Sequence, residues 1–308
     1  MSKIHEALRK AQQERNANVT NGNRSSQSEV VGPVDIPSLA VSPVVPGGFA
    51  TPAHSTTPGD FFRIDYLREH CVKPVWKINP EVMVFAEDSD LVAAAEQFRN
   101  LRSHLYQLRE NRQLRSLLIT SALASEGKTF VASNLAQAIA RQPGQRVLLI
   151  DADLRLSKLH IPLGAPCTPG LSDFLRGNAN LTDVMQHATK ENLYFIPGGN
   201  SIADPTELIL NGRFKDLVER LTPTFDWIIM DSPPTLAVSD AGLLADLCDG
   251  VLLVVRAAST NLDAIQKACN KYRERNLAGV VLNRVEHQYT YDSYYGYGTE
   301  RGAKVESV

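Results

Sequence analysis

Residues 122–129, with the sequence ALASEGKT, have the residue types and spacing of a phosphate-binding loop. They fit the pattern (A or G)xxxxGK(S or T), in which backbone N–H groups of the loop and of the following helix surround a phosphate. Lys128 would reach the β- and γ-phosphates of a nucleotide, and Thr129 would offer its hydroxyl to Mg²⁺. The loop therefore supplies the predicted nucleotide contacts Ala122, Ser125, Glu126, Gly127, Lys128, Thr129 and Phe130.

Carboxylates at the ends of two apolar segments are the second chemical feature. Asp151 and Asp153 end the segment RVLLIDAD, and Asp231 ends WIIMD. Ligands of an open parallel sheet collect at the carboxyl ends of its strands, so these side chains should converge on the phosphate loop and bind Mg²⁺ directly or through water. Asp151 and Asp153 are two positions apart and would face the same side of an extended backbone. The alternative is that each aspartate only caps a turn.

Tyrosines near the C-terminus form the third feature. Five of the nine tyrosines fall between positions 289 and 297, namely Tyr289, Tyr291, Tyr294, Tyr295 and Tyr297. Their neighbours are Gly, Ser and Asp, which will not build a core, whereas buried aromatic residues are normally spread over strands and helices. A flexible, tyrosine-dense tail suits phosphoryl acceptance, because a phenol must extend into another active site. The alternative is a low-complexity tail without this role.

Alternating strand-like and helix-like segments must position these residues. The strand-like runs are rich in Val, Ile and Leu on both faces, as a parallel sheet covered by helices requires. The β–α alternation predicts a doubly wound, mostly parallel α/β fold of the P-loop NTPase type. We expect strands at 114–121, 146–153, 192–199, 225–234, 249–257 and 279–285, and helices at 89–108, 128–140, 204–221, 238–248 and 261–275.

The 308 residues suffice for one α/β domain of roughly 200 residues with flanking segments. The net charge of -2 gives no global field toward nucleic acid or a membrane, and we expect no nucleic-acid partner. The four cysteines are far apart, which is typical of reduced thiols in a cytosolic protein. Neither a signal sequence nor an apolar run of roughly 18–20 residues is found, so we expect a cytoplasmic protein whose membrane role requires a partner.

Composition predicts four parts along the chain. Residues 1–16 form an amphipathic helix, with apolar residues at helical spacing, which either docks onto a partner or frays. Residues 17–87 are a largely disordered linker rich in Asn, Ser, Thr, Pro and Gly, although its aromatic part, 61–87, has the composition to pack onto the domain edge. The P-loop domain occupies 88–284 and the tyrosine tail 285–308.

Taken together, these motifs resemble the bacterial tyrosine kinase (BY-kinase) family of capsule and exopolysaccharide assembly. The resemblance rests on SALASEGKT, LLIDADLR, IIMDSPP, the tyrosine tail, and the helix motif of Glu96, Arg99 and Arg102. It implies an autokinase that uses ATP and Mg²⁺, with Lys128, Thr129, Asp151, Asp153 and Asp231 at its centre. Asp151 would be the base or orienter of the tyrosine hydroxyl, and Asn283 would contact the adenine.

The resemblance also implies partners. Glu96, Arg99 and Arg102 match the motif that joins subunits of this family into a ring, in which one subunit's tail reaches the next subunit's site. Without the other motifs, an exposed helix with i, i+3 charge pairs would be the preferred interpretation. A membrane-bound, polysaccharide co-polymerase-like activator would recruit the kinase to the inner face of the membrane, and a tyrosine phosphatase would reverse the modification.

Two positions depart from the family pattern, and two other functions stay open. Ser125 replaces a loop glycine, which costs strain if this residue needs a positive φ, and Ser157 replaces a frequent proline. A partitioning or division-site ATPase is one alternative, but it carries a lysine early in the loop, where this chain has Leu123. A nucleotide-binding scaffold without catalysis is the other.

Overall fold

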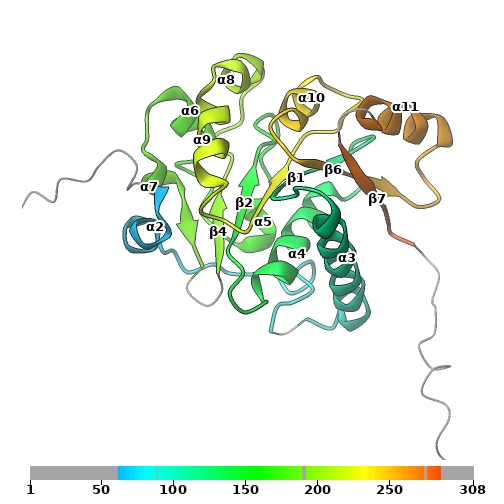
Figure 1. Cartoon of the computed structure of the whole chain (residues 1–308), viewed down its shortest axis with the longest axis horizontal. Helices are drawn as coiled ribbons and strands as arrows, with labels where there is room; N and C mark the ends of the chain where they lie inside the picture. The colour runs from blue at the N-terminus through cyan, green and yellow to red at the C-terminus, as the bar shows by residue number, and fades with distance from the viewer. Residues whose placement is uncertain (1–61, 88, 189–191, 274–275, 286–308) are drawn as a thin grey trace, which may run out of the picture. The chain divides into compact units, whose positions relative to one another are not determined.

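The computed structural model describes residues 62–87, 89–188, 192–273 and 276–285. Within these ranges one seven-stranded sheet has the order β3-β4-β2-β5-β1-β6-β7 (Figure 1). All neighbouring strands are parallel except the edge pair β3 and β4. The strands are β1 (Ser116–Ser121), β2 (Val147–Asp151), β3 (Gln186–His187), β4 (Leu193–Ile196), β5 (Trp227–Asp231), β6 (Gly250–Arg256) and β7 (Leu277–Asn283).

Helices cover both faces of this sheet, which confirms the predicted doubly wound fold (Figure 1). They are α2 (Ile64–His70), α3 (Val92–Asn111), α4 (Lys128–Ala140), α5 (His160–Leu163), α6 (Leu171–Arg176), α7 (Leu181–Val184), α8 (Thr206–Leu210), α9 (Arg213–Leu221), α10 (Asp240–Ala245) and α11 (Leu262–Arg273).

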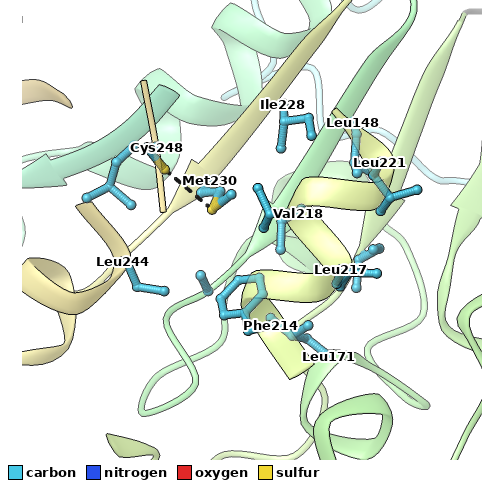
Figure 2. Packing of buried hydrophobic residues seen from close by; sticks show 14 of the residues in the cluster. Leu148, Leu171, Phe214, Leu217, Val218, Leu221, Ile228, Met230, Leu244 and Cys248 are labelled. Carbon is cyan, nitrogen blue, oxygen red and sulfur yellow. Dashed lines mark hydrogen bonds between the residues drawn. The ribbon is translucent and has the colours of Figure 1, made fainter. Parts of the chain in front are cut away.

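Successive side chains of each strand point to opposite faces of the sheet, so the core has two main layers, one on each face. In β2, Leu148 and Ile150 pack with residues of α2, α6, α9 and α10, whereas Val147 and Leu149 pack with residues of α3, α4 and α5. Figure 2 shows the first layer, where Phe214 and its neighbours on α9 lie against Leu148, Ile228 and Met230. Strands that are apolar on both sides are therefore buried on both sides.

The single helix expected over 204–221 is two helices, α8 and α9. The break lies at Asn211 and Gly212, where Gly212 has φ 83°. The Asn211 side chain accepts a hydrogen bond from the Arg213 N–H at 3.0 Å, so it opens the second helix. A left-handed residue cannot continue an α-helix, and the Asn-Gly pair explains the division.

The segment at 62–87 packs onto the domain, as its aromatic composition indicated, so the ordered part of the domain extends before the expected boundary at residue 88. Met83 and Val84 are buried in the layer of α3 and α4. The Val84 N–H donates to Oδ1 of Asn134 on α4 at 2.8 Å. Apolar and aromatic residues give this segment enough buried surface to offset its ordering entropy.

Three predicted parts, the helix at 1–16, the linker from 17 to 61 and the tyrosines between 289 and 297, lie outside the described residues. Within the described ranges, none of the helices has both the length and the apolar character that crossing a bilayer requires.

Candidate functional site

The phosphate loop joins the last residue of β1, Ser121, to the first residue of α4, Lys128. Gly127 has φ 97°, and a side chain there would collide with the amide of Asn283, so this position requires glycine. Ser125 also has a positive φ, 64°, so the strain anticipated for a non-glycine residue is present, at roughly 1 kcal/mol. The loop therefore has two residues of positive φ, Ser125 and Gly127, and the serine adopts the conformation that favours glycine.

Hydrogen bonds of the Glu126 carboxylate and the Asn283 amide hold the loop in place. The Glu126 carboxylate accepts hydrogen bonds from the Leu123 N–H at 2.7 Å and from the Thr260 hydroxyl. The Asn283 amide donates to the Glu126 carbonyl at 2.8 Å and accepts from the Arg284 N–H at 2.9 Å. Both ends of the Asn283 amide are thus engaged, and its adenine contact stays a prediction. Thr260 had no signal in the sequence, because it lies 134 positions from Glu126.

The two remaining loop candidates are packing residues. Ala122 is buried, and its carbonyl accepts a hydrogen bond from the Leu236 N–H at 3.3 Å. The ring of Phe130, on the first turn of α4, lies edge-on to Phe98 of α3 with centroids 5.6 Å apart. Their side chains therefore support the loop and the helix rather than line a phosphate site.

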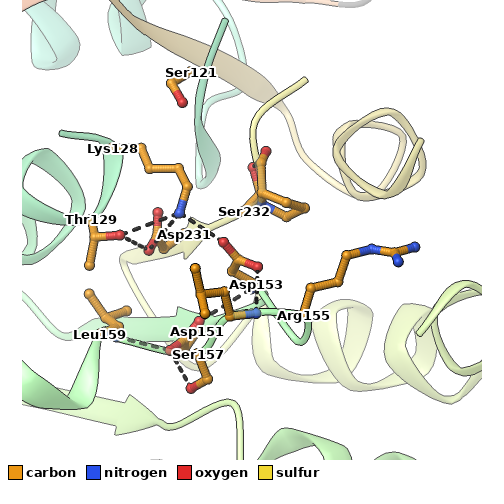
Figure 3. Close-up of polar contacts among 12 residues, drawn as sticks. Ser121, Lys128, Thr129, Asp151, Asp153, Arg155, Ser157, Leu159, Asp231 and Ser232 are labelled. Carbon is orange, nitrogen blue, oxygen red and sulfur yellow. Dashed lines mark hydrogen bonds and ion pairs between the residues drawn. The ribbon is translucent and has the colours of Figure 1, made fainter. Parts of the chain in front are cut away.

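Lys128 and three oxygen-bearing side chains form the centre of the site (Figure 3). Its Nζ lies 2.9 Å from Oδ2 of Asp153 and 3.8 Å from Oδ2 of Asp231. The Thr129 hydroxyl donates to the same Asp231 oxygen at 2.6 Å. The structure thus brings together the predicted phosphate ligand, the predicted metal ligands and two strand ends that are far apart in sequence.

Asp151 is held separately by the turn that follows β2 (Figure 3). Its Oδ2 accepts hydrogen bonds from the Ser157 hydroxyl at 2.7 Å and the Leu159 N–H at 3.0 Å. Its Oδ1 accepts from the Asp153 N–H at 3.2 Å. Because β2 ends at Asp151, strand alternation does not set the direction of Asp153, and the argument that both aspartates face one side does not apply.

Burial and charge shift the pKa values of this cluster. Burial, and then the charge of Asp231, raise the pKa of Asp151 to about 7, although the Ser157 and Leu159 hydrogen bonds oppose this. Burial likewise raises the pKa of Asp231, against the charge of Lys128. Burial lowers the pKa of Lys128, but the charges of Asp231 and Asp153 outweigh it and the pKa is raised. Asp151 and Asp231 are therefore harder to ionise than free aspartates, and an added cation would favour their ionised forms.

The residues present fit a magnesium ion that is shared with a nucleotide. Oδ1 of Asp231 is buried and has no hydrogen-bond partner, while the Thr129 hydroxyl contacts the other oxygen of the same carboxylate. The described residues contain no group of three or more His, Cys, Asp or Glu side chains arranged to hold a metal. Mg²⁺ in nucleotide sites uses one or two carboxylates, with phosphate oxygens and water completing its shell.

Arg155 was not among the predicted site residues. Its guanidinium binds the buried Asp240 at the start of α10 through two hydrogen bonds of 2.6 and 3.0 Å, and it lies 3.3 Å from Asp204. It thereby fastens the turn after β2 to α10 and to the loop before α8. Its position two residues after Asp153 in LLIDADLR could have indicated that Arg155 belongs to the site. Its partner Asp240 could not be predicted, because it lies 85 positions away in the sequence.

The predicted assembly motif lies on α3. Glu96 and Arg99 are exposed and pair with each other at 2.7 Å, which is the i, i+3 arrangement considered as an alternative. Arg102 turns toward the domain and donates to the Ala138 carbonyl on α4 at 2.6 Å. Their role in assembly stays a prediction.

Comparisons with known proteins agree with this geometry. Residues 123–278 match the family described as AAA domain. The tyrosine-protein kinase CpsD of Streptococcus agalactiae is 35% identical over 208 residues, which cover 66% of this chain and 89% of CpsD. The solved kinase domain of Escherichia coli tyrosine kinase ETK has a TM-score of 0.61 and 30% identity, and the match covers 73% of this chain and 96% of that domain.

Some relatives are much longer. The tyrosine-protein kinase wzc of Salmonella typhi is 32% identical over 219 residues, which cover 70% of this chain. This chain spans only 30% of the length of wzc. Similarity that runs through nearly all of CpsD and of the ETK kinase domain shows that the chain belongs to the family of bacterial tyrosine-protein kinases.

Proposed function

We propose that this chain is an ATP-dependent tyrosine autokinase that phosphorylates the C-terminal tyrosines of another copy of itself. The observation that carries the proposal is the convergence of Lys128, Thr129, Asp153 and Asp231 within 2.6–3.8 Å behind a phosphate loop. Membership of a family whose relatives are named tyrosine-protein kinases gives this site its reaction class.

Each residue has a role in this proposal. Lys128 would leave Asp153 for the β- and γ-phosphates of ATP, because a triphosphate offers more negative charge than one carboxylate. Thr129 and Asp231, with Asp153 and Asp151 directly or through water, would hold Mg²⁺, which neutralises charge on the transferred phosphoryl group when bound. Positioning and charge neutralisation, rather than a covalent enzyme intermediate, would supply most of the catalysis.

Asp151 would orient the tyrosine hydroxyl and accept its proton. The phenol oxygen forms a bond to the γ-phosphorus while the bond to the oxygen that bridges the β- and γ-phosphates breaks, and ADP leaves. A carboxyl group whose pKa is near 7 suits this transfer, because it is partly ionised at neutral pH and still basic.

The acceptors would be Tyr289, Tyr291, Tyr294, Tyr295 and Tyr297, delivered in trans within a ring of subunits. The exposed Glu96 and Arg99 on α3 are available to exchange their mutual pair for pairs with a neighbouring subunit. A membrane-bound, co-polymerase-like activator would recruit the chain to the inner face of the membrane, and a tyrosine phosphatase would reset it. Control of capsule or exopolysaccharide export would be the outcome.

Phosphotransfer assays test the proposal. Purified protein is incubated with labelled ATP and Mg²⁺, with an activating fragment if required, and phosphotyrosine is mapped by mass spectrometry. We expect label between residues 289 and 297 that disappears in Lys128→Met and persists in Lys215→Met, a matched control at an exposed lysine of α9. ATP hydrolysis without tail label would instead support a partitioning-type ATPase, and nucleotide binding without either activity would support a scaffold.

Trans-phosphorylation can be separated from self-phosphorylation by mixing two variants. One carries Lys128→Met and an intact tail, and the other carries Tyr→Phe at all five tail positions. Label on the first variant only in the mixture is the expected result, because the second supplies the active site. A mixture that stays unlabelled, while wild type is labelled, would contradict transfer between subunits.

A further inference from the structure

Ser157 lies in the turn after β2 and contacts the side chain that the proposed function assigns to the phenol. Its hydroxyl donates to Oδ2 of Asp151 at 2.7 Å, and the Leu159 N–H donates to the same oxygen at 3.0 Å. The third donor, the Asp153 N–H, bonds to the other oxygen, Oδ1, at 3.2 Å. Two of these three donors are backbone groups, so Ser157 is the side chain that fixes the carboxylate (Figure 3).

The surroundings leave little freedom to this hydroxyl. A Cβ atom placed on Gly198, just beyond β4, would lie 2.6 Å from Oγ and 2.9 Å from Cβ of Ser157. On another side, Sγ of Cys167 is 4.0 Å from Oγ. The glycine thus makes space for the half-buried serine side chain, whose hydroxyl points at Asp151.

We infer that Ser157 is a positioning residue for phosphotransfer: its hydroxyl, in the space left by Gly198, holds Oδ2 of Asp151 in the 157–159 turn and leaves Oδ1 on the side of Asp153. Without the hydroxyl, one backbone N–H remains on Oδ2, and the carboxylate can rotate about its χ2 bond. This inference rests on the proposed function, in which that carboxylate orients the acceptor and contributes to the Mg²⁺ site.

The test compares Ser157→Ala with Ser201→Ala, a control at an exposed serine. The kcat for tail phosphorylation is expected to fall about 10-fold in Ser157→Ala, the size typical of a lost hydrogen bond to a charged group. KM for ATP and the Tm are expected to stay within about twofold and about 2 °C of wild type. A purely structural role would lower the Tm and leave kcat per folded molecule unchanged.

A second variant approaches the same contact from the other side. Gly198→Ala should displace the Ser157 hydroxyl and lower kcat to a similar extent, although residue 198 is not part of the proposed catalytic centre. The double variant should lose less than the sum of the two single losses, because both variants disturb the hydrogen bond from Ser157 to Asp151. The Cβ added at residue 198 would also lie 2.9 Å from the Ser157 Cβ and 3.3 Å from the Asp151 carbonyl oxygen, so part of the single loss of Gly198→Ala persists in the double variant. Additive losses would overturn the inference, and this variant carries the test should Ser157→Ala unfold.

A readout independent of activity separates this inference from the proposed function. The Mg²⁺ concentration at half-maximal binding of a fluorescent ATP analogue should rise about threefold or more in Ser157→Ala, since a freed carboxylate contributes less to the metal site. The inference fails if both kcat and this midpoint match the Ser201→Ala control. If wild type labels no tyrosine but the midpoint still shifts, the kinase proposal fails and the positioning role stands.

Discussion

The middle and the tips of the same strands have opposite properties. Along β2 and β5, the paired residues up to Ile150 and Met230 are apolar and buried on both faces. One position further, the register pairs Asp151 with Asp231, and both carboxyl groups are buried. The strand middles therefore stabilise the fold, whereas the tips concentrate charge that the fold must tolerate.

This contrast explains how the site is kept in shape. Among the described residues, the ion pairs of Asp153 and Asp231 share one cation, Lys128, and Asp151 relies on hydrogen bonds. Lys128 is one cation among three aspartates, so the site can accept the further positive charge of a Mg²⁺ ion. The packed core holds the strand ends in place, so these carboxyl groups stay close together although they repel one another.

The largest effect should come from the core. Phe214→Ala removes a fully buried ring of α9 and should lower the free energy of unfolding by about 3–5 kcal/mol. Leu210→Ala, at an exposed position of α8, is the control and should change it by less than about 0.5 kcal/mol. Urea unfolding measures both. Equal effects would mean that the α9 layer is not the core of this face.

The buried carboxyl groups at the strand ends should make the free energy of unfolding depend on pH. The folded-state pKa of Asp151, about 7, lies above its ordinary 3.8, so the folded state binds more protons between these values. The free energy of unfolding of the protein without Mg²⁺ and nucleotide should therefore fall as pH rises from about 4 to 7, by on the order of 3 kcal/mol.

Asp151→Asn is the control for this pH dependence. It should flatten the decline, and the slope that remains would come from Asp231, whose pKa burial also raises. Thermal unfolding at pH 5, 6 and 7 measures the slope. A stability that rises over this range in wild type would show that Asp151 ionises easily in the fold.

Lys128→Met should affect binding more than folding. Loss of the cation that faces Asp153 and Asp231 should weaken ATP binding about 100-fold, or about 2.7 kcal/mol, because the remaining carboxylates repel the phosphates. Titration with a fluorescent nucleotide measures this, with Lys215→Met on α9 as the matched control. Unchanged ATP affinity in Lys128→Met would show that the phosphate loop does not bind the nucleotide.

The smallest effect concerns backbone strain in the loop. Ser125→Gly should raise the free energy of unfolding by up to about 1 kcal/mol, because Ser125 has φ 64° and glycine adopts this conformation without steric cost. Activity should be equal or higher. Ser201→Gly in an exposed loop is the control and should be neutral or slightly destabilising. Destabilisation by Ser125→Gly would mean that the serine side chain supports the loop.

Local patterns were sufficient to predict six of the seven strands and the edge of the sheet at which the candidate site residues meet. Lys128 and Thr129 follow a strand and open a helix, and the aspartates end apolar runs, so a parallel sheet must bring them to one edge. The same reasoning failed for segments without a strong period. It did not predict α2 or the short edge strand β3, and it merged α8 with α9 across Gly212.

What the sequence determined by itself is the list of chemical groups and the sheet edge on which they meet, because strand and helix periods and a loop motif are local properties. Only the tertiary structure decided how those groups are held. Ser157 beneath Asp151, Thr260 behind Glu126 and Asp240 opposite Arg155 depend on turn geometry or on chain segments far apart in sequence. Such contacts leave no periodic trace, since they form only when the packed core fixes where each loop ends.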